Sequence, residues 1–238
     1  MEMEKIAKRP LIGINSHYAE DAHKWYKVPI NYVNAVYNSG GLPVIIPCNP
    51  SEEELRAYVS QLDGIVFTGG ADYPAELYGG EKPEHEDPMD DVRPKTDLML
   101  MDMVLNESDI PILGICAGHQ LLAISLGMKL IGHIPTAEYH GMNGDVDHPV
   151  KIKGGKYLKS IFNAEKIIVN SYHHQAVDKE GLPSDYTISA MAEDGVLEAI
   201  EYTGDRCILG VQWHPERTKS KEHTKMIFDF FIGQIKER

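Results

Sequence analysis

The sequence predicts a single α/β domain over residues 1–238, with a mainly parallel central sheet flanked by helices and a smaller antiparallel extension. In the first half of the chain, short apolar runs alternate with helix-like segments, which is typical of βαβ units. In the second half, strand-like runs follow one another with few helices between them. The sequence contains no repeat, low-complexity segment or linker that would divide it.

The first half begins as a βαβ unit. Residues 9–16 are expected to form a strand, and residues 28–47 a helix followed by a second strand. The next helix begins with a capping box, in which Ser51 and Glu54 cap each other's backbone. The elements expected from there on are a helix over 51–64, a strand over 64–70, a surface loop rich in Pro, Gly and acid over 71–94, a helix over 95–108, a strand over 110–115 and a helix over 118–127.

The second half reads mainly as strands. Residues 186–192 and 196–202 are expected to pair as a hairpin, because a short turn with a glycine joins them. The chain is expected to end in an amphipathic helix over 221–237. The other expected strands are 148–153, 166–170 and 207–213.

Composition excludes several classes of function. A formal net charge of −13 repels phosphate backbones, so we expect no nucleic-acid partner. The three cysteines are too few for a disulfide framework and fit a reducing compartment. Neither a signal-peptide core nor an uninterrupted apolar span is present, so we expect a cytoplasmic protein without a membrane partner. A homo-oligomer is compatible with the sequence.

Cys116 stands on a predicted strand-to-helix turn, between Gly114 and Gly118. This is the cysteine form of a nucleophile elbow, in which a strained backbone requires very small neighbours. The following helix N-terminus favours the thiolate, and the Ala117 amide is placed to donate to an oxyanion. The alternative is a buried structural cysteine between two ordinary glycines, which this motif alone leaves open.

A thiol nucleophile needs a base and a group that orients the base. His214 follows an apolar strand, and Glu216 lies two residues later, where an extended segment points both side chains the same way. We expect His214 to accept the Cys116 proton and Glu216 to hold the imidazole. The alternative is a strand-end histidine beside a solvated glutamate.

The glycines that follow residues 64–67 are candidates for the second oxyanion donor, because glycines let backbone amides approach a ligand. Gly70 is the first choice and Gly69 the next. An ordinary turn is an equally good interpretation of this stretch alone.

Together these motifs resemble a known family. T-G-G at 68–70, G-I-C-A-G-H-Q at 114–120 and W-H-P-E at 213–216 resemble, in this order, the class I glutamine amidotransferase-like family, whose fold is flavodoxin-like with three layers. G-G-A-D-Y-P-A-E-L-Y-G at 69–79 and V-N-S-Y-H-H-Q-A-V at 169–177 are similar to its gamma-glutamyl-gamma-aminobutyrate hydrolase group of cysteine peptidases. The first and last stretches that match this group are R-P-L-I-G-I at 9–14 and A-E-D-G-V-L-E-A-I-E at 192–201.

The resemblance implies a catalytic triad and a substrate pocket. It implies a triad of Cys116, His214 and Glu216, with backbone donors near Gly70 and Ala117. The other residues that it places at the substrate are Gly69, Gln120, Asn170, Ser171, Tyr172 and His173.

The chain departs from the hydrolase group at two positions. Ala117 stands where members often carry arginine, and Pro94 replaces the second acid of a D-x-x-R-D pattern that retains Asp90 and Arg93. Both departures leave the triad intact and leave the amine side of the substrate open.

No metal and no cofactor is expected. Adjacent histidines of S-Y-H-H-Q at 171–175 point to opposite faces of a strand, and the acidic run at 84–91 is most simply a solvated loop. The same explanation applies to Asp145, Asp147 and His148. Cys48 and Cys207 lack flanking glycines and are expected to be packing residues.

Three functions follow as hypotheses. The first is a hydrolase that cleaves the gamma-amide of a small gamma-glutamyl compound through a thioester, releasing glutamate and an amine. The second is a glutaminase subunit that supplies ammonia to a synthetase partner. The third is a binding protein that keeps the fold without the activity.

Overall fold

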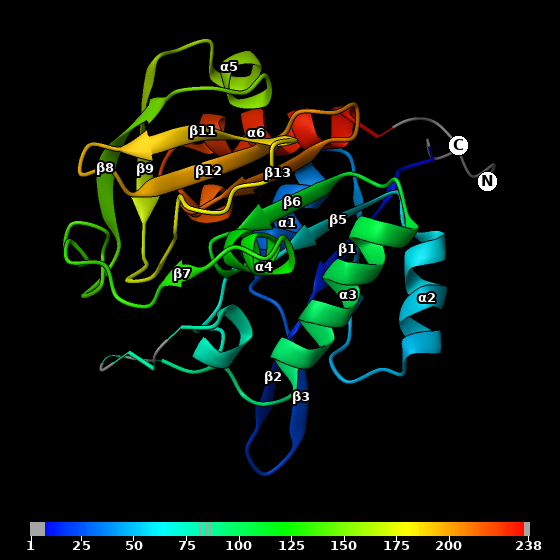
Figure 1. Cartoon of the computed structure of the whole chain (residues 1–238). Helices are drawn as coiled ribbons and strands as arrows, with labels where there is room; N and C mark the ends of the chain where they lie inside the picture. The colour runs from blue at the N-terminus through cyan, green and yellow to red at the C-terminus, as the bar shows by residue number, and fades with distance from the viewer. Residues whose placement is uncertain (1–7, 81, 84, 86, 236–238) are drawn as a thin grey trace.

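The computed structural model describes residues 8–80, 82, 83, 85 and 87–235, and a nine-stranded sheet runs through this part of the chain (Figure 1). From β4 to β13 neighbouring strands are parallel, and from β13 to β9 they are antiparallel, which confirms the predicted fold class. In spatial order the strands are β4 (Leu42–Ile46), β1 (Leu11–Asn15), β5 (Gly64–Phe67), β6 (Ile112–Ile115), β13 (Ile208–Val211), β12 (Leu197–Tyr202), β11 (Tyr186–Ala192), β8 (Val146–Ile152) and β9 (Lys166–Ser171).

Helices cover both faces of this sheet and make three layers (Figure 1). On β5, Ile65 and Phe67 belong to one buried core and Val66 to the other, because successive strand residues point to opposite faces. The first core is covered by α2 (Glu52–Gln61), α3 (Arg93–Glu107) and α4 (Ala117–Ser125), and the second by α1 (Ile30–Asn38), α5 (Tyr157–Phe162) and α6 (Lys221–Gly233).

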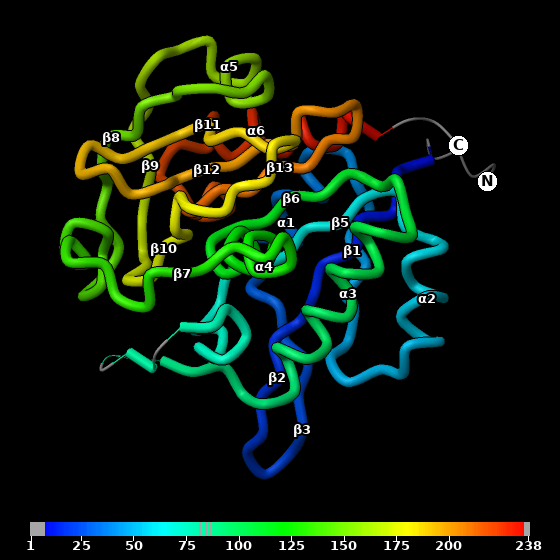
Figure 2. Tube along the Cα trace, in the orientation of Figure 1, coloured from blue at the N-terminus to red at the C-terminus, as the bar shows by residue number. Residues whose placement is uncertain are grey.

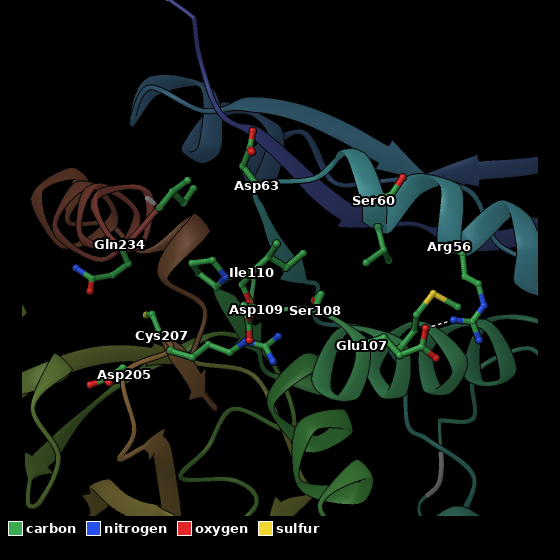
Figure 3. Close-up of a pocket in the computed structure, with 15 residues that line it drawn as sticks. Arg56, Ser60, Asp63, Glu107, Ser108, Asp109, Ile110, Asp205, Cys207 and Gln234 are labelled. Atoms are coloured by element: carbon green, nitrogen blue, oxygen red, sulfur yellow. Dashed lines mark hydrogen bonds and ion pairs between the residues drawn. The ribbon is translucent and has the colours of Figure 1, made fainter. Parts of the chain in front are cut away.

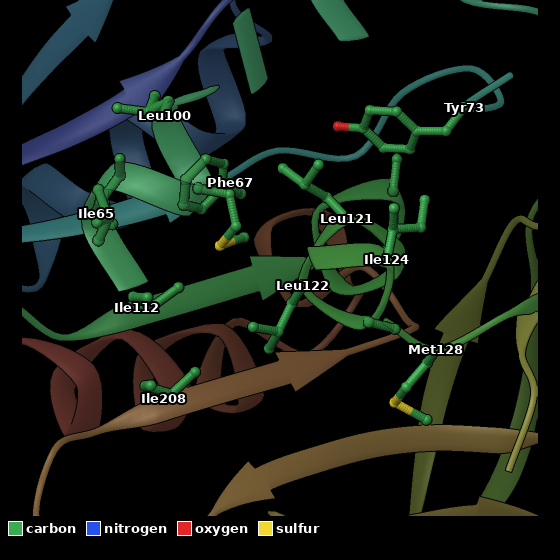
Figure 4. Packing of buried hydrophobic residues seen from close by; sticks show 14 of the residues in the cluster. Ile65, Phe67, Tyr73, Leu100, Ile112, Leu121, Leu122, Ile124, Met128 and Ile208 are labelled. Carbon is green, nitrogen blue, oxygen red and sulfur yellow. The ribbon is translucent and has the colours of Figure 1, made fainter. Parts of the chain in front are cut away.

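The core beneath α3 and α4 fixes the position of α4. Leu121 and Leu122 on α4 pack with Phe67 on β5 and Ile112 on β6, and all four side chains are buried (Figure 4). Each such side chain contributes about 1.5–3 kcal/mol when it leaves water. This packing holds the N-terminus of α4 directly behind the end of β6.

The larger predicted elements are confirmed, and the capping box is present. Ser51 Oγ accepts from the Glu54 amide at 3.2 Å, and the Ser51 amide donates to Glu54 Oε2 at 2.7 Å. The terminal helix ends at Gly233, and residues 236 and 237 of its predicted range lie outside the described residues.

Several short elements were not predicted. The β2–β3 hairpin extends beyond the sheet (Figure 2), and its largely exposed side chains give no apolar alternation. The remaining unpredicted elements are two to six residues long, which is too short for a periodic pattern of apolar residues. These elements are β2 (His17–Glu20), β3 (Lys24–Lys27), η1 (Ala75–Tyr78), β7 (Leu130–Ile131), α5, β10 (Ala176–Val177) and η2 (Pro215–Arg217).

The prediction of a surface loop over 71–94 was wrong in part. Tyr73 and Tyr78 are buried in the core, and α3 begins at Arg93, whose side chain is also buried. Aromatic side chains interrupt the polar composition and anchor the segment, so it packs on the domain instead of lying on its surface. Residues 81, 84 and 86 lie outside the described part.

No helix in the described part of the chain has the length and apolar character needed to cross a bilayer.

Two glycines let α4 come unusually close to the sheet. A Cβ on Gly118 would lie 2.2 Å from the carbonyl oxygen of Phe67, and one on Gly114 would lie 2.6 Å from that of Gly118. Both clashes are with backbone, which cannot move aside as a side chain does. The small residues of the predicted elbow are therefore required by packing at this crossing.

We expect Gly118→Ala to lower the free energy of unfolding by about 1–3 kcal/mol or more, because it overpacks this crossing. The matched control is Gly233→Ala at the end of α6, where an added Cβ meets no atom within 4 Å. That variant is expected to be neutral or slightly stabilising. Urea unfolding of both variants checks this, and equal stabilities would contradict the close approach.

Candidate active site

Three adjacent parallel strands bring the predicted site residues together. β5, β6 and β13 are neighbours in the sheet, and their carboxyl ends lead into Gly69–Gly70, Cys116 and His214. Because parallel strands end at the same edge, residues separated by some 145 positions in the chain meet there. The order of strands in the sheet therefore brings the glycine turn, the cysteine and the histidine together.

Cys116 has a strained backbone that the surrounding hydrogen bonds hold in place. Its φ of 54° and ψ of −108° are rare for a residue with a side chain and cost about 1–3 kcal/mol. Its amide donates to the Val211 carbonyl at 2.8 Å, and its carbonyl accepts from the amides of His119 and Gln120. The conformation places the sulfur at the N-terminus of α4, which is the positive end of the helix dipole.

His214 lies beside the sulfur and is held by Glu216. The ring Nδ1 donates to Glu216 Oε1 at 2.9 Å, which fixes the tautomer. A Cβ on Gly69 would lie 2.8 Å from His214 Cε1 and 3.4 Å from Cys116 Cβ, so both side chains flank the same point. Among the described residues Nε2 has no hydrogen-bond partner, which leaves it free to exchange a proton with a bound substrate.

Opposing effects set the charge of His214. Burial lowers its pKa, but the Cys116 sulfur and the Glu216 carboxylate together raise it to about 10. The imidazolium is therefore favoured at neutral pH. A cationic ring next to the sulfur is the arrangement that activates a cysteine nucleophile.

The structure distinguishes between the two glycine amides proposed as oxyanion donors. The Gly69 amide donates to the Tyr32 hydroxyl at 2.9 Å, so it is already engaged. The amides of Gly70 and Ala117 have no partner among the described residues. Gly70 and Ala117 therefore remain the candidate pair, as the sequence favoured.

Arg93 supports the Gly69–Gly70 turn from behind. Its Nη1 donates to the Gly69 carbonyl at 3.1 Å and its Nη2 to the Thr68 carbonyl at 3.0 Å. Its Nε donates to Asp97 Oδ2 at 2.9 Å, and both side chains are buried. Asp97, one helical turn later, is the buried acid partner of Arg93. Arg93 thus faces the Gly69–Gly70 turn.

Sequence reasoning missed Asp97 and its other partners. Asp97 also accepts from the Asn15 amide group at 2.8 Å and from the Tyr73 hydroxyl at 2.6 Å. Asn15 Oδ1 in turn accepts from the Thr68 amide at 2.7 Å. The one available signal was the i, i+4 spacing of Arg93 and Asp97 on a predicted helix.

A cavity of about 310 Å³ opens beside the sulfur. Gln120 borders it and is fixed by donating to the Gln175 carbonyl at 3.3 Å and to Gln212 Oε1 at 3.4 Å. Gln212 Nε2 lies 3.7 Å from Cys116 Sγ. The residues that line the cavity are Gly70, Ala71, Asp72, His85, Asp87, Cys116, Gln120, Gly141, Met142 and Tyr172–Gln175.

Two of the four residues predicted on the 170–173 segment border this cavity. Tyr172 and His173 line it, and the Tyr172 carbonyl lies 4.0 Å from Cys116 Sγ. The Ser171 hydroxyl instead donates to the His140 carbonyl at 3.0 Å, and the Asn170 carbonyl faces the His214 amide at 3.5 Å. The Ser171 hydroxyl and the Asn170 carbonyl thus make their contacts away from the cavity.

A larger cavity of about 820 Å³ lies at the opposite end of the sheet (Figure 3). Arg56 and Glu107 pair at its rim, and Cys207 borders it. Burial raises the pKa of the Cys207 thiol to about 12, and no histidine lines this cavity. Burial likewise raises the pKa of Cys48 to about 11. Both thiols are buried, as expected for packing residues, and neither has a nucleophile's surroundings.

We expect Tyr32→Phe to lower the free energy of unfolding by about 1–3 kcal/mol, because it leaves the buried Gly69 amide without an acceptor. The matched control is Tyr37→Phe on the same helix, where the ring is half exposed. Urea unfolding measures both. A loss no larger in Tyr32→Phe than in the control would show that this hydrogen bond is immaterial.

We expect acid to destabilise the protein through His17. Burial, and then the charges of Arg93 and Lys27, lower its pKa from 6.5 to about 3. Between these values the unfolded chain binds a proton that the folded chain excludes, so stability falls as pH falls. His17→Gln should show a shallower loss between pH 7 and pH 4 than His23→Gln, a control in the same hairpin. Parallel curves would contradict this assignment.

Comparisons with known proteins show which proteins this chain is similar to. Residues 10–216 match the model of the Peptidase C26 family. A Rickettsia prowazekii protein named "Putative glutamine amidotransferase-like protein" is 30% identical over 89% of this chain and 92% of its own length. Gamma-glutamyl-gamma-aminobutyrate hydrolase of Escherichia coli is 28% identical over 97% of this chain and 95% of its own.

One solved structure shows the same fold. The Thermoplasma acidophilum protein titled "putative gmp synthase subunit a" superposes with a TM-score of 0.68 at 20% identity, over 97% of this chain and 96% of that chain. The matched family model spans the elbow, the glycine turn and the histidine–glutamate pair described above. The chain therefore belongs to the Peptidase C26 family.

Proposed function

We propose that this protein is a cysteine-dependent hydrolase that cleaves the gamma-amide bond of a small gamma-glutamyl compound. The observation that carries the proposal is the arrangement around Cys116. A strained thiol at a helix N-terminus, a histidine oriented by a carboxylate and two unengaged amides lie together where β5, β6 and β13 end, and the thiol borders a cavity. These are the parts that acyl transfer through a thioester requires.

In the first half of the reaction, Cys116 Sγ attacks the amide carbonyl carbon as a thiolate. The carbonyl electrons move to oxygen, and the amides of Gly70 and Ala117 stabilise the oxyanion. The imidazolium of His214 donates its Nε2 proton to the amine nitrogen as the C–N bond breaks. The amine leaves, and a gamma-glutamyl thioester and a neutral imidazole remain.

In the second half, water attacks the thioester carbonyl. His214 Nε2 accepts a proton from the water, the C–S bond breaks, and glutamate leaves. The thiolate and imidazolium are restored together. Glu216 keeps Nε2 directed at the reacting atoms by accepting from Nδ1 throughout.

The Escherichia coli relative supports this choice of substrate class, because its name specifies a gamma-glutamyl amide. The cavity supports it as well, since it holds Gln120 at the position that the resemblance assigns to the glutamyl group. The glutaminase hypothesis differs only in the amine, which is ammonia for glutamine. A substrate panel distinguishes the two.

We expect the purified protein to release glutamate from gamma-glutamyl amides without a partner. Cys116→Ala should lower kcat/KM by about 10⁴-fold or more, because the covalent route is lost. Cys207→Ala, at the far cavity, serves as the control and should keep wild-type activity. Retained activity in Cys116→Ala would contradict the mechanism.

The same panel includes glutamine alone. Hydrolysis of extended gamma-glutamyl amines in preference to glutamine supports the hydrolase. If ammonia is released from glutamine only when a synthetase is added, the glutaminase hypothesis is supported and the hydrolase hypothesis is rejected.

A further inference from the structure

Four buried side chains converge on one point in the antiparallel half of the sheet. His148 comes from β8, Glu198 from β12, His173 from the segment after β9 and His140 from the loop between β7 and β8. All four are at most 6% exposed, and their inward nitrogen and oxygen atoms lie within 4.8 Å of one another. The proposed mechanism uses none of these atoms.

The inward atoms of this cluster have no hydrogen-bond partner in the described part of the chain. This holds for His140 Nδ1, His148 Nε2, His173 Nε2 and both carboxylate oxygens of Glu198. The three nitrogens lie 3.3, 3.5 and 3.8 Å from Glu198 Oε1, without hydrogen-bond geometry. Polar atoms that are this deeply buried are normally satisfied, so a cluster of five calls for an explanation.

The outward nitrogen of each ring contacts an acceptor. His140 Nε2 lies 2.9 Å from Asp194 Oδ2, His173 Nδ1 lies 2.9 Å from the Gln175 carbonyl, and His148 Nδ1 lies 3.3 Å from the Pro149 carbonyl. Carboxylates and carbonyls only accept, so these nitrogens carry the protons. The inward nitrogens then present lone pairs to the centre, which is the arrangement of metal-binding histidines.

We propose that His140, His148, His173 and Glu198 bind one divalent transition-metal ion, with Zn²⁺ as the best match. Three imidazole nitrogens and a carboxylate oxygen are ligands that Zn²⁺ accepts, whereas Ca²⁺ and Mg²⁺ prefer oxygen. With bonds of about 2.0–2.1 Å, tetrahedral ligand atoms lie about 3.3–3.4 Å apart. The shortest of the three distances to Glu198 Oε1, from His140 Nδ1, is 3.3 Å and equals this separation.

Four protein ligands complete a tetrahedral shell, which identifies the site as structural. Its position shows what it stabilises. His173 lines the cavity next to Tyr172, and the Glu198 carbonyl accepts from the Gln212 amide at 2.8 Å. The Gln212 side chain reaches Cys116 Sγ. The ion would therefore fix one wall of the cavity to the sheet that carries the base.

The neighbouring acidic residues do not belong to this site. Asp145 pairs with Arg217, and Asp147 pairs with Lys219 at 2.7 Å. His174 points away from the cluster, to Asp72 at 2.9 Å, and both His173 and His174 lie in the irregular segment between β9 and β10 and not on a strand. The sequence contained no sign of this cluster, because His140, His173 and Glu198 are distant from one another in the chain.

Metal content and a cobalt spectrum test the proposal on the whole protein. We expect one zinc per chain by elemental analysis after purification without added metal. Protein stripped with a chelator should bind one Co²⁺ and show the visible absorption of a tetrahedral nitrogen–oxygen site. Zn²⁺ should displace the cobalt and raise Tm, because an ion that binds the folded state stabilises it.

Variants locate the bound ion. Glu198→Gln and His148→Gln should abolish the cobalt absorption, and Asp194→Asn should weaken Zn²⁺ binding about 10–100-fold through His140. His23→Gln, at the exposed hairpin, is the matched control and should bind as the wild type does. The metal content and the Co²⁺ spectrum of the wild-type protein test the proposal even if a variant fails to fold.

Two results would overturn the proposal. One is stripped wild-type protein that takes up neither Zn²⁺ nor Co²⁺ and whose Tm is unchanged by either ion. The other is a ligand variant that is folded by circular dichroism and binds Co²⁺ with the wild-type spectrum. Neither result bears on the Cys116 mechanism, which the substrate panel tests separately.

Discussion

The structure depends on the close approach of α4 to the ends of β5 and β6 while Cys116 holds a positive φ. A strained residue persists only where its surroundings determine it, and here two hydrophobic cores and three backbone hydrogen bonds do so. Gly118 permits the contact because it has no Cβ to meet the Phe67 carbonyl. The sulfur is then presented at the helix N-terminus by the packing of the domain and not by a flexible loop.

The glycine turn opposite the sulfur is built on a buried ion pair. Removing Arg93 and Asp97 from water is costly, and the cost is offset only because every strong donor has a partner. Arg93 divides its donors between Asp97 and the carbonyls of Thr68 and Gly69, which holds the backbone that leads into Gly70. A single buried guanidinium thus supports the turn that carries Gly70, the candidate oxyanion donor.

The two halves of the sheet meet at β13, which is parallel to β6 and antiparallel to β12. This strand leads into His214, and Gln212, the residue after the strand, joins the sulfur to the Glu198 backbone. The antiparallel strands therefore do more than extend the sheet. They position the 172–175 segment that forms the far wall of the cavity, and the histidine cluster lies where they converge.

Local patterns predicted the order of strands and helices, the elbow at Cys116 and the pairing of His214 with Glu216, which lie two residues apart. These features depend on neighbours in sequence, through apolar periodicity, capping and glycine placement. The Ser51 capping box is of the same kind, and it formed as expected.

Only the tertiary structure decided which amide is free, what Arg93 does and where four ligand-type side chains meet. Gly69 and Gly70 are alike in sequence, and the hydroxyl of Tyr32, from a helix 37 residues away, separates them. Asp97 and the histidine cluster likewise act through partners brought by distant strands. Sequence periodicity predicts which face of a strand or helix a side chain occupies. It does not predict which distant residue that side chain will contact, because the order of strands in the sheet determines those contacts.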